Sequence, residues 1–168
     1  MIILYQSNTG FTREYAQMLA KAEKLKCYEQ GEGPQPLAGE EVFYMGPLMA
    51  GHITGLDQAM KRYAVKGICG VGMSPPGEQV LSTMARTNYT KGLPVFYLQG
   101  GWAPRKVGWL KRRMVGMVTR STRKALQEKG SRRTPEEEQG LNFLVHGGSY
   151  VAYENLAPIQ SWLREQEP

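Results

Sequence analysis

Short apolar runs alternate with amphipathic segments from the first residue to residue 101. Apolar runs bounded by glycine, proline and polar residues are typical of strands buried on both faces of a parallel sheet. Five runs predict strands: "MIILY" (1–5), "KCYEQ" (26–30), "EVFYMG" (41–46), "GICGVGM" (67–73) and "LPVFYLQGG" (93–101). Apolar residues at helical spacing between these runs predict helices over 12–24, 56–64 and 80–89.

This alternation predicts an α/β fold with a doubly wound, parallel, five-stranded sheet and helices on both faces. Beyond the last strand the pattern becomes mostly helical, which predicts a helical insertion or extension at about 105–147 with a long helix over 106–127. A last helix begins near Asn155. The length of 168 residues and the 41% apolar content suit a single domain over 1–168.

Helix-capping signals stand out at two places. Thr134, Pro135 and Glu137 form a capping-box pattern, and Gly147 follows the predicted end of that helix. Thr12 is placed to be the N-cap of the first helix.

The segment between the opening strand and the first helix, "SNTGFT" (7–12), lies where parallel sheets bind ligands, beyond the carboxyl end of a strand. The helix N-terminus points free N–H groups at this place, and Ser7, Thr9 and Thr12 add hydroxyl groups. Gly10 lets the backbone approach a ligand closely. The segment therefore predicts a phosphate site, although an ordinary turn with a helix cap has the same composition.

Charge is concentrated in one segment. The chain has 21 Lys plus Arg against 15 Asp plus Glu, a formal net charge of +6. Residues 105–133 hold eleven of the basic residues and one acid, Glu128, so the rest of the chain has ten basic residues against fourteen acids.

In that segment the basic residues flank an apolar stripe of Val107, Leu110, Met114, Met117 and Val118, with Trp109 beside it. Three interpretations remain open: a solvated face whose stripe packs on the sheet, docking to an anionic membrane surface, or binding to an acidic protein or nucleic acid. Nucleic acid is not expected, because aromatic residues are few and no nucleic-acid motif is present. Nine of the eleven basic residues flank the stripe: Lys106, Lys111, Arg112, Arg113, Arg120, Arg123, Lys124, Arg132 and Arg133.

Other chemistry-bearing residues give no pattern of their own. Cys27 and Cys69 have apolar neighbours and no CxxC spacing, so we interpret them as reduced packing residues. His146 is best explained as a partner of the dipole at a helix C-terminus. With His52 the only other histidine, no metal site is expected. No apolar run reaches eighteen residues and no leader pattern is present, which predicts a cytoplasmic protein.

The stretch "LYQSNTGFTREYAQMLA" resembles the amino end of the flavodoxins, whose [ST]xTGxT loop wraps the phosphate of FMN. "VFYMGPLMAGHITG" is similar to the second flavin loop of that family, and "VGMSPPGEQ" stands where the third would be. "GHITGLDQAMKRY", "LQGGWAPRKVGWLKRRMVGMV" and the basic composition resemble the subgroup that contains menaquinone-dependent protoporphyrinogen oxidase.

The resemblance implies a flavodoxin-like fold with FMN as cofactor. It implies that the phosphate is held by Ser7, Asn8, Thr9, Gly10, Phe11 and Thr12. It implies that the ring lies between a second loop of Pro47, Leu48, Met49, Ala50, Gly51 and His52 and a third loop of Met73, Ser74, Pro75, Pro76 and Gly77.

The chain departs from the electron-carrier flavodoxins at the ring site. Those proteins commonly stack an aromatic residue on the ring, whereas neither loop here contains Trp, Tyr or Phe. Met49, Leu48 or a residue from elsewhere, such as Trp102, would have to take this role. We hypothesise that Met49 and His52 line the ring and that the peptide of Gly51 or a neighbouring peptide lies near its N5 edge.

The sequence thus predicts an FMN-binding flavodoxin-like oxidoreductase or electron-transfer protein. It would pass electrons to or from a quinone, a porphyrinogen or a protein partner, with the donor and acceptor left open. Because the flavin carries the chemistry, no catalytic side chain is expected. The alternative is a non-catalytic flavodoxin-fold module that binds a membrane surface or an acidic partner through its basic helix. A peripheral place at the inner face of the membrane, through 105–133, is compatible with both.

Overall fold

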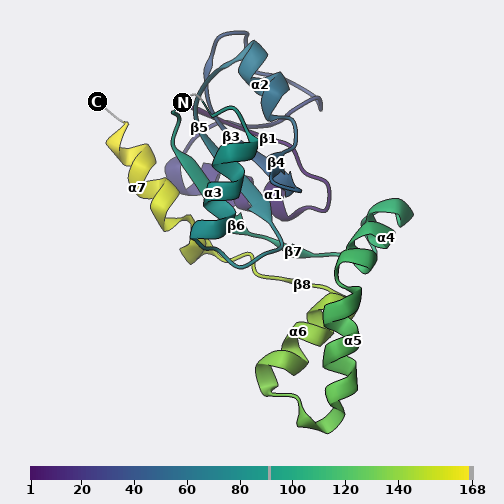
Figure 1. The fold of residues 1–168 in the computed structure, drawn as a ribbon. Helices are drawn as coiled ribbons and strands as arrows, with labels where there is room; N and C mark the ends of the chain where they lie inside the picture. Colours follow the sequence, from purple (N-terminus) through teal and green to yellow (C-terminus); the bar gives the residue numbers. More distant parts are fainter. Residues whose placement is uncertain (91, 167–168) are drawn as a thin grey trace. The chain divides into compact units, whose positions relative to one another are not determined.

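The structure is a computed structural model that describes residues 1–90 and 92–166, without the side chains of Lys111 and Val118. Those two predicted members of the basic set and of the apolar stripe therefore lie outside the described side chains. The chain forms two compact units (Figure 1). Unit 1 contains residues 1–100 and the chain from Tyr150 onward, and unit 2 is Gly101–Ser149.

The core of unit 1 is a mostly parallel sheet, which confirms the predicted α/β fold. Its five parallel strands follow the order β2-β1-β3-β5-β6, and β4 pairs antiparallel with β3. The sheet therefore has six strands rather than the predicted five. The strands are β1 (Ile2–Tyr5), β2 (Cys27–Glu29), β3 (Glu41–Met49), β4 (His52–Ile53), β5 (Ala64–Gly72) and β6 (Val95–Gln99).

The extra strand arises where the sequence pattern predicted a loop after residue 46. β3 continues to Met49, and His52 of β4 pairs with Met49 across a two-residue turn. Ala50 (φ 49°) and Gly51 (φ 85°) both have positive φ, the backbone of a turn that matches the twist of a hairpin. Pro47, which has no N–H to donate, made the strand seem to end early.

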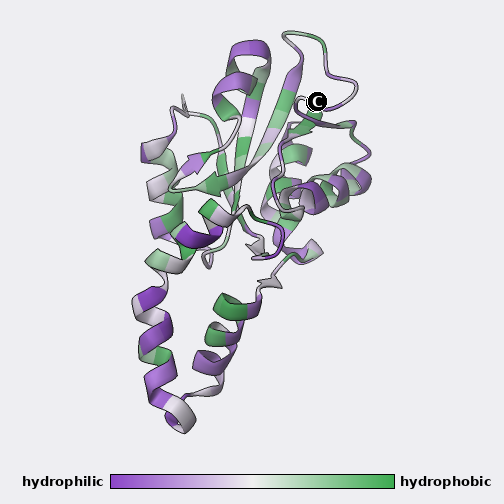
Figure 2. Ribbon diagram, turned by 90° about the vertical axis from the view of Figure 1, so that its right-hand side faces the viewer, coloured by the Kyte–Doolittle hydropathy of each residue, from purple (hydrophilic) through white to green (hydrophobic). Residues whose placement is uncertain are grey.

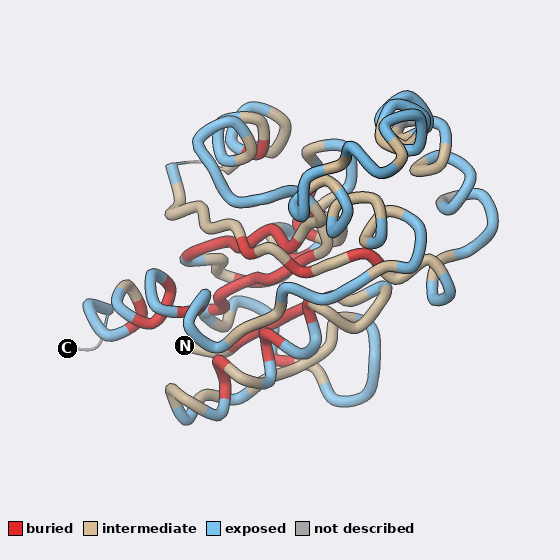
Figure 3. Tube along the Cα trace, turned by 90° about the horizontal axis from the view of Figure 1, so that it is seen from below, coloured by how far each residue is buried: buried red, intermediate tan, exposed pale blue. Residues whose placement is uncertain are grey.

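Helices cover both faces of the sheet. On one face α1 (Phe11–Glu23) and α7 (Ala157–Glu165) bury side chains against β1, β3 and β5. On the other, α2 (Leu56–Arg62) and α3 (Glu78–Thr87) pack on the alternate residues of the same strands. Figure 3 shows the buried positions concentrated in the strands and on the inner sides of these helices. Leu156, Ile159 and Leu163 are buried as predicted.

Two predictions about helices are wrong. Gly10, not Thr12, is the N-cap of α1, because its positive φ (102°) turns the chain into the helix; Thr12 lies buried in the first turn. The long helix predicted over 106–127 is two helices, α4 (Trp109–Val118) and α5 (Arg120–Lys129). Thr119 separates them with a turn (φ −92°, ψ 0°) at the edge of the helical region.

Unit 2 holds α4 and α5, a 3₁₀ turn η1 (Gly130–Arg132), α6 (Pro135–His146) and the antiparallel pair β7 (Gly101–Trp102) and β8 (Gly148–Ser149). The predicted capping box of α6 is confirmed. Thr134 Oγ1 accepts from the N–H of Glu137 at 3.2 Å, and the Glu137 carboxylate accepts from the N–H of Thr134 at 3.1 Å. Figure 2 shows α5 mainly hydrophilic along its length.

The chain leaves and re-enters unit 1 at adjacent points. The N–H of Tyr150 donates to the carbonyl of Gly100 at 2.8 Å. The buried hydroxyl of Tyr15 donates to the Gln99 carbonyl at 2.7 Å and accepts from Asn155 Nδ2 at 2.7 Å. A short 3₁₀ helix, η2 (Tyr153–Leu156), then leads into α7. These bonds hold together the two chain segments of unit 1 that flank unit 2 in the sequence.

Candidate functional site

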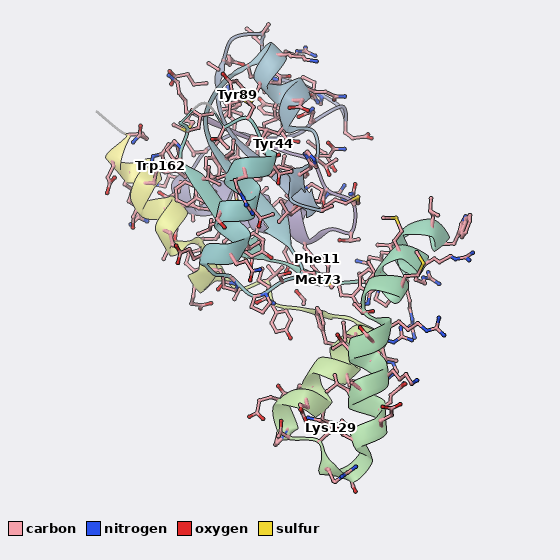
Figure 4. The ribbon with its side chains drawn as sticks, viewed as in Figure 1. Phe11, Tyr44, Met73, Tyr89, Lys129 and Trp162 are labelled. Carbon is pink, nitrogen blue, oxygen red and sulfur yellow. The ribbon has the colours of Figure 1, made fainter. Side chains whose placement is uncertain are left out.

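Three loops of unit 1 lie at the carboxyl edge of its sheet. The first (7–10) follows β1, the second is the turn between β3 and β4, and the third (73–77) follows β5. Because β1, β3 and β5 are parallel neighbours, their carboxyl ends share one edge, which is where α/β sheets bind ligands. Figure 4 labels Phe11, at the start of α1, and Met73, in the third loop.

The first loop is shaped to present backbone N–H groups. Ser7 Oγ accepts from the N–H of Gly10 at 3.1 Å, and the first bond inside α1 runs from the N–H of Glu14 to the Gly10 carbonyl. The N–H groups of Phe11, Thr12 and Arg13 therefore have no acceptor within the helix. Together with the positive end of the helix dipole, they suit an anion such as a phosphate.

The second and third loops border a hollow of about 740 Å³. Of the residues predicted for these loops, the hollow is lined by Leu48, Ala50, Gly51, Met73, Ser74, Pro75, Pro76 and Gly77. Residues that sequence reasoning missed complete the lining: Gly72, Gln79, Val80, Thr83 and Tyr97. The two predicted loops thus meet around one space.

The other predicted residues of the second loop lie elsewhere. Pro47 pairs with Val71 inside the sheet. Met49 and His52 face each other across the hairpin and are both exposed. Among the described residues, these three do not belong to the lining of the hollow. The hypothesis that Met49 and His52 line the ring gains no support from this arrangement.

Asn88, directly after α3, holds the second loop in place. Its Oδ1 accepts from the N–H of Ile53 at 2.9 Å, and its Nδ2 donates to the carbonyls of Gly51 at 2.7 Å and Met84 at 2.8 Å. Gly51 also lies against α3, since a Cβ there would be 2.8 Å from Thr87 Oγ1. The Ala50–Gly51 turn is therefore held against α3 by the side chain of Asn88 and by the close contact between the backbone of Gly51 and Thr87.

Two side chains of β6 hold the third loop. The Tyr97 hydroxyl donates to the Ser74 carbonyl at 2.6 Å, and Gln99 Nε2 donates to the Met73 carbonyl at 3.2 Å. Burial raises the pKa of Tyr97 to about 12, so the hydroxyl keeps its proton and stays a donor at neutral pH. Gly72 accommodates this tyrosine, because a Cβ there would be 2.8 Å from the Tyr97 oxygen.

Tyr97 changes the expectation about aromatic residues at the site. The two loops contain none, but β6 brings this ring into the wall of the hollow. Trp102, the aromatic residue that the sequence suggested, belongs to unit 2, where its indole N–H donates to the Leu144 carbonyl at 3.3 Å. Tyr97 and Gln99 alternate with the apolar Phe96 and Leu98 along β6. This alternation, which places the two polar-tipped side chains on one face of the strand, is the signal that could have identified them.

The thiols of Cys27 and Cys69 are unsuited to act as nucleophiles or metal ligands. Burial raises the pKa of Cys27 to about 11 and raises the pKa of the fully buried Cys69 further. Both are therefore protonated at neutral pH, and a protonated thiol is a poor nucleophile and a poor metal ligand. Both cysteines are free, in agreement with their interpretation as packing residues.

No family model matches this chain, and neither does any curated protein. Its function is therefore inferred from the chemistry of its own residues. The free N–H groups of the first turn of α1 and a hollow with both apolar and polar walls lie at the same edge of the sheet. Among the described residues, none of the first loop (7–12) is part of the lining of the hollow.

Replacing Tyr97 by phenylalanine should loosen the third loop without opening a cavity. The change removes the hydrogen bond to Ser74, so we expect the free energy of unfolding to fall by about 1 kcal/mol and Tm by about 2–4 °C. Thermal unfolding followed by circular dichroism measures this. Tyr28→Phe, in β2, is the matched control, and an equal loss in both variants would contradict the role assigned to Tyr97.

Proposed function

We propose that this protein is an FMN-binding oxidoreductase or electron-transfer protein with a flavodoxin-like, doubly wound fold. The observation that carries the proposal is the hollow between the second and third loops, at the carboxyl edge to which the first loop also belongs. The strand order β2-β1-β3-β5-β6 supports it too. From β1 the chain adds β2 on one side and the later strands on the other, so β1 and β3 border the point where the strand order changes side, which is where such sheets bind ligands.

The residues present fit FMN in three respects. The volume of about 740 Å³ lies within the range of cofactor pockets. Leu48, Val80 and Pro76 give the hollow apolar surface for a ring, while Gly51 and Gly77 leave backbone groups accessible to its polar edge. The N–H groups of Phe11 and Thr12 suit the phosphate, with neutral donors in place of a basic side chain.

Bound FMN would supply the electron-transfer chemistry, and the chain would bind, orient and shield it. In this proposal the first loop holds the phosphate, and the clamped Ala50–Gly51 turn and the third loop form the two sides of the ring site. No side chain is assigned a catalytic role. A quinone, a porphyrinogen or a protein is proposed as the redox partner.

The proposal is tested by titrating the full chain with FMN and with riboflavin, which lacks the phosphate. Purified protein carrying oxidised flavin absorbs near ~450 nm. We expect Thr12→Val, which keeps the shape of this buried side chain but removes its hydroxyl, to weaken FMN binding about 10-fold or more. Riboflavin binding should stay unchanged, because only the phosphate contact is lost.

Thr122→Val, at an exposed position of α5, is the control for this substitution. A chain that binds neither FMN nor riboflavin would end the proposal. Equal losses of FMN and riboflavin affinity in Thr12→Val would instead show that Thr12 does not act on the phosphate.

The second candidate is a non-catalytic module that keeps the fold and binds a partner through α4. The exposed apolar and basic side chains of that helix favour it. A colourless protein that leaves added FMN free, but still binds its partner surface, would support this candidate over the first.

A further inference from the structure

Helix α4 of unit 2 leaves its large apolar side chains uncovered. Trp109 is 72% exposed, Met117 62%, Leu110 57% and Met114 50%. At ~100° per residue these four positions fall within an arc of roughly 140° around the helix. Leu110, Met114 and Met117 of the predicted apolar stripe are therefore exposed on α4, together with Trp109.

Basic residues lie within this exposed face and next to it. Arg105, Lys106, Arg112 and Arg113 are exposed, and α4 has no acidic residue. Unit 2 as a whole has eleven basic and four acidic residues, a net charge of +7, whereas the rest of the chain has ten basic and eleven acidic residues. Glu128, Glu137 and Glu138 are themselves paired with Lys124, Lys129 and Arg133.

A partner for α4 must therefore be anionic and also able to bury apolar side chains. A second copy of unit 2 would bring +7 against +7. Nucleic acid would meet the charge but leave Leu110, Met114 and Met117 without apolar contacts. An anionic lipid surface satisfies both requirements, because headgroup phosphates lie directly above hydrocarbon.

We propose that α4 docks the protein on an anionic lipid surface. The helix lies flat, with Trp109, Leu110, Met114 and Met117 inserted between the lipids. Lys106 and Arg113 contact headgroup phosphates, and the stem of Arg113, within the apolar arc, extends its guanidinium to the same level. At ten residues α4 is ~15 Å long, and no helix in the described part of the chain is long and apolar enough to cross a membrane.

This inference goes beyond the proposed function and does not depend on FMN. The test is co-sedimentation of the full chain with vesicles of pure phosphatidylcholine and with vesicles that also contain phosphatidylglycerol. We expect binding only to the second kind. We also expect the Trp emission to shift to shorter wavelength, because Trp109 is the most exposed of the three Trp residues.

Two paired variants separate insertion from attraction. Leu110→Ser with Met117→Ser should reduce binding about tenfold or more, and Lys106→Gln with Arg113→Gln should reduce it about fivefold per residue at low salt. Leu37→Ser, at an exposed position of unit 1, and Lys61→Gln, on α2, are the matched controls and should bind as the unmodified chain does.

Three results would overturn the proposal: equal binding to neutral vesicles, wild-type binding by the Leu110→Ser/Met117→Ser variant, or no binding to either vesicle. The last would favour an acidic protein as the partner. Trp109→Phe gives an independent readout, since it should abolish the emission shift while leaving most of the binding.

Discussion

Alanine in place of Asn88 is expected to lower the free energy of unfolding by about 3 kcal/mol and Tm by about 6–12 °C. The side chain makes three hydrogen bonds at 2.7–2.9 Å, two of them to backbone groups of the hairpin at Ile53 and Gly51. Alanine leaves those part-buried groups without their partner. An unsatisfied buried N–H or C=O costs more than a lost bond alone.

The effect should also be local and measurable at the site. Hydrogen exchange at the N–H of Ile53, which Asn88 protects, should accelerate more than exchange in β1 or β6. If the proposed function holds, FMN affinity should fall with it, because the Ala50–Gly51 turn forms one side of the ring site. Ser7 and Thr12 are untouched, so the phosphate contact should remain.

Two further variants separate the clamp from general destabilisation. Asn88→Asp keeps the acceptor for Ile53 but loses the donor to Gly51 and Met84, so it should fall between alanine and the unmodified chain. Asn142→Ala, at an exposed position of α6, should change Tm by less than about 1 °C. An Asn88→Ala protein as stable as this control would show that the hairpin does not need the clamp.

The fold was largely predictable because its strands are buried on both faces. In β3 the residues from Val42 to Gly46 form a continuous buried run, and such a run is readable without knowledge of its neighbours. The hairpin was not predictable in the same way. Its turn depends on positive φ at Ala50, a residue that rarely adopts that conformation, and Pro47 suggested an earlier end to the strand.

The loops of the candidate site were predictable for a related reason: each directly follows a strand. The side chains that hold them were not. Asn88 bonds to Ile53 and Gly51 from 35 and 37 residues away, and Tyr97 bonds to Ser74 from 23 residues away. Such partners are set by how α3 and β6 pack on the sheet, which periodicity does not reveal. The same limit applies to α4, where spacing identified an apolar face but not whether anything covers it.

The second large effect concerns unit 2 as a whole. We expect that replacing residues 101–149 by Asn-Gly leaves unit 1 folded. The N–H of Tyr150 already donates to the carbonyl of Gly100 at 2.8 Å. After the replacement, Gly100 and Tyr150 would be the first and last residues of a four-residue turn, and this bond is the one that closes such a turn. Asn-Gly readily adopts the positive φ angles of such a turn, so the new connection needs no movement of either end.

Packing supports the same result. Most side chains of the two core clusters of unit 1 come from β1, β3, β5 and the helices that cover them, and among the described side chains neither cluster includes one from 101–149. Tyr15 and Asn155, which fasten the end of β6 to the segment leading into α7, also stay in place. Circular dichroism should show a cooperative thermal transition, and the formal net charge should change from +6 to −1, because unit 2 carries +7.

This excision also tests the proposed FMN site and the proposed lipid docking of α4 separately. If FMN binds in the hollow of unit 1, its affinity should stay within about threefold, because every residue that lines the hollow is retained. Binding to anionic vesicles should be lost, because α4 and the excess of basic residues are gone. A shortened chain that fails to unfold cooperatively would mean that unit 1 needs unit 2 for its stability. A folded chain that loses FMN but keeps its core would place part of the cofactor site in residues 101–149.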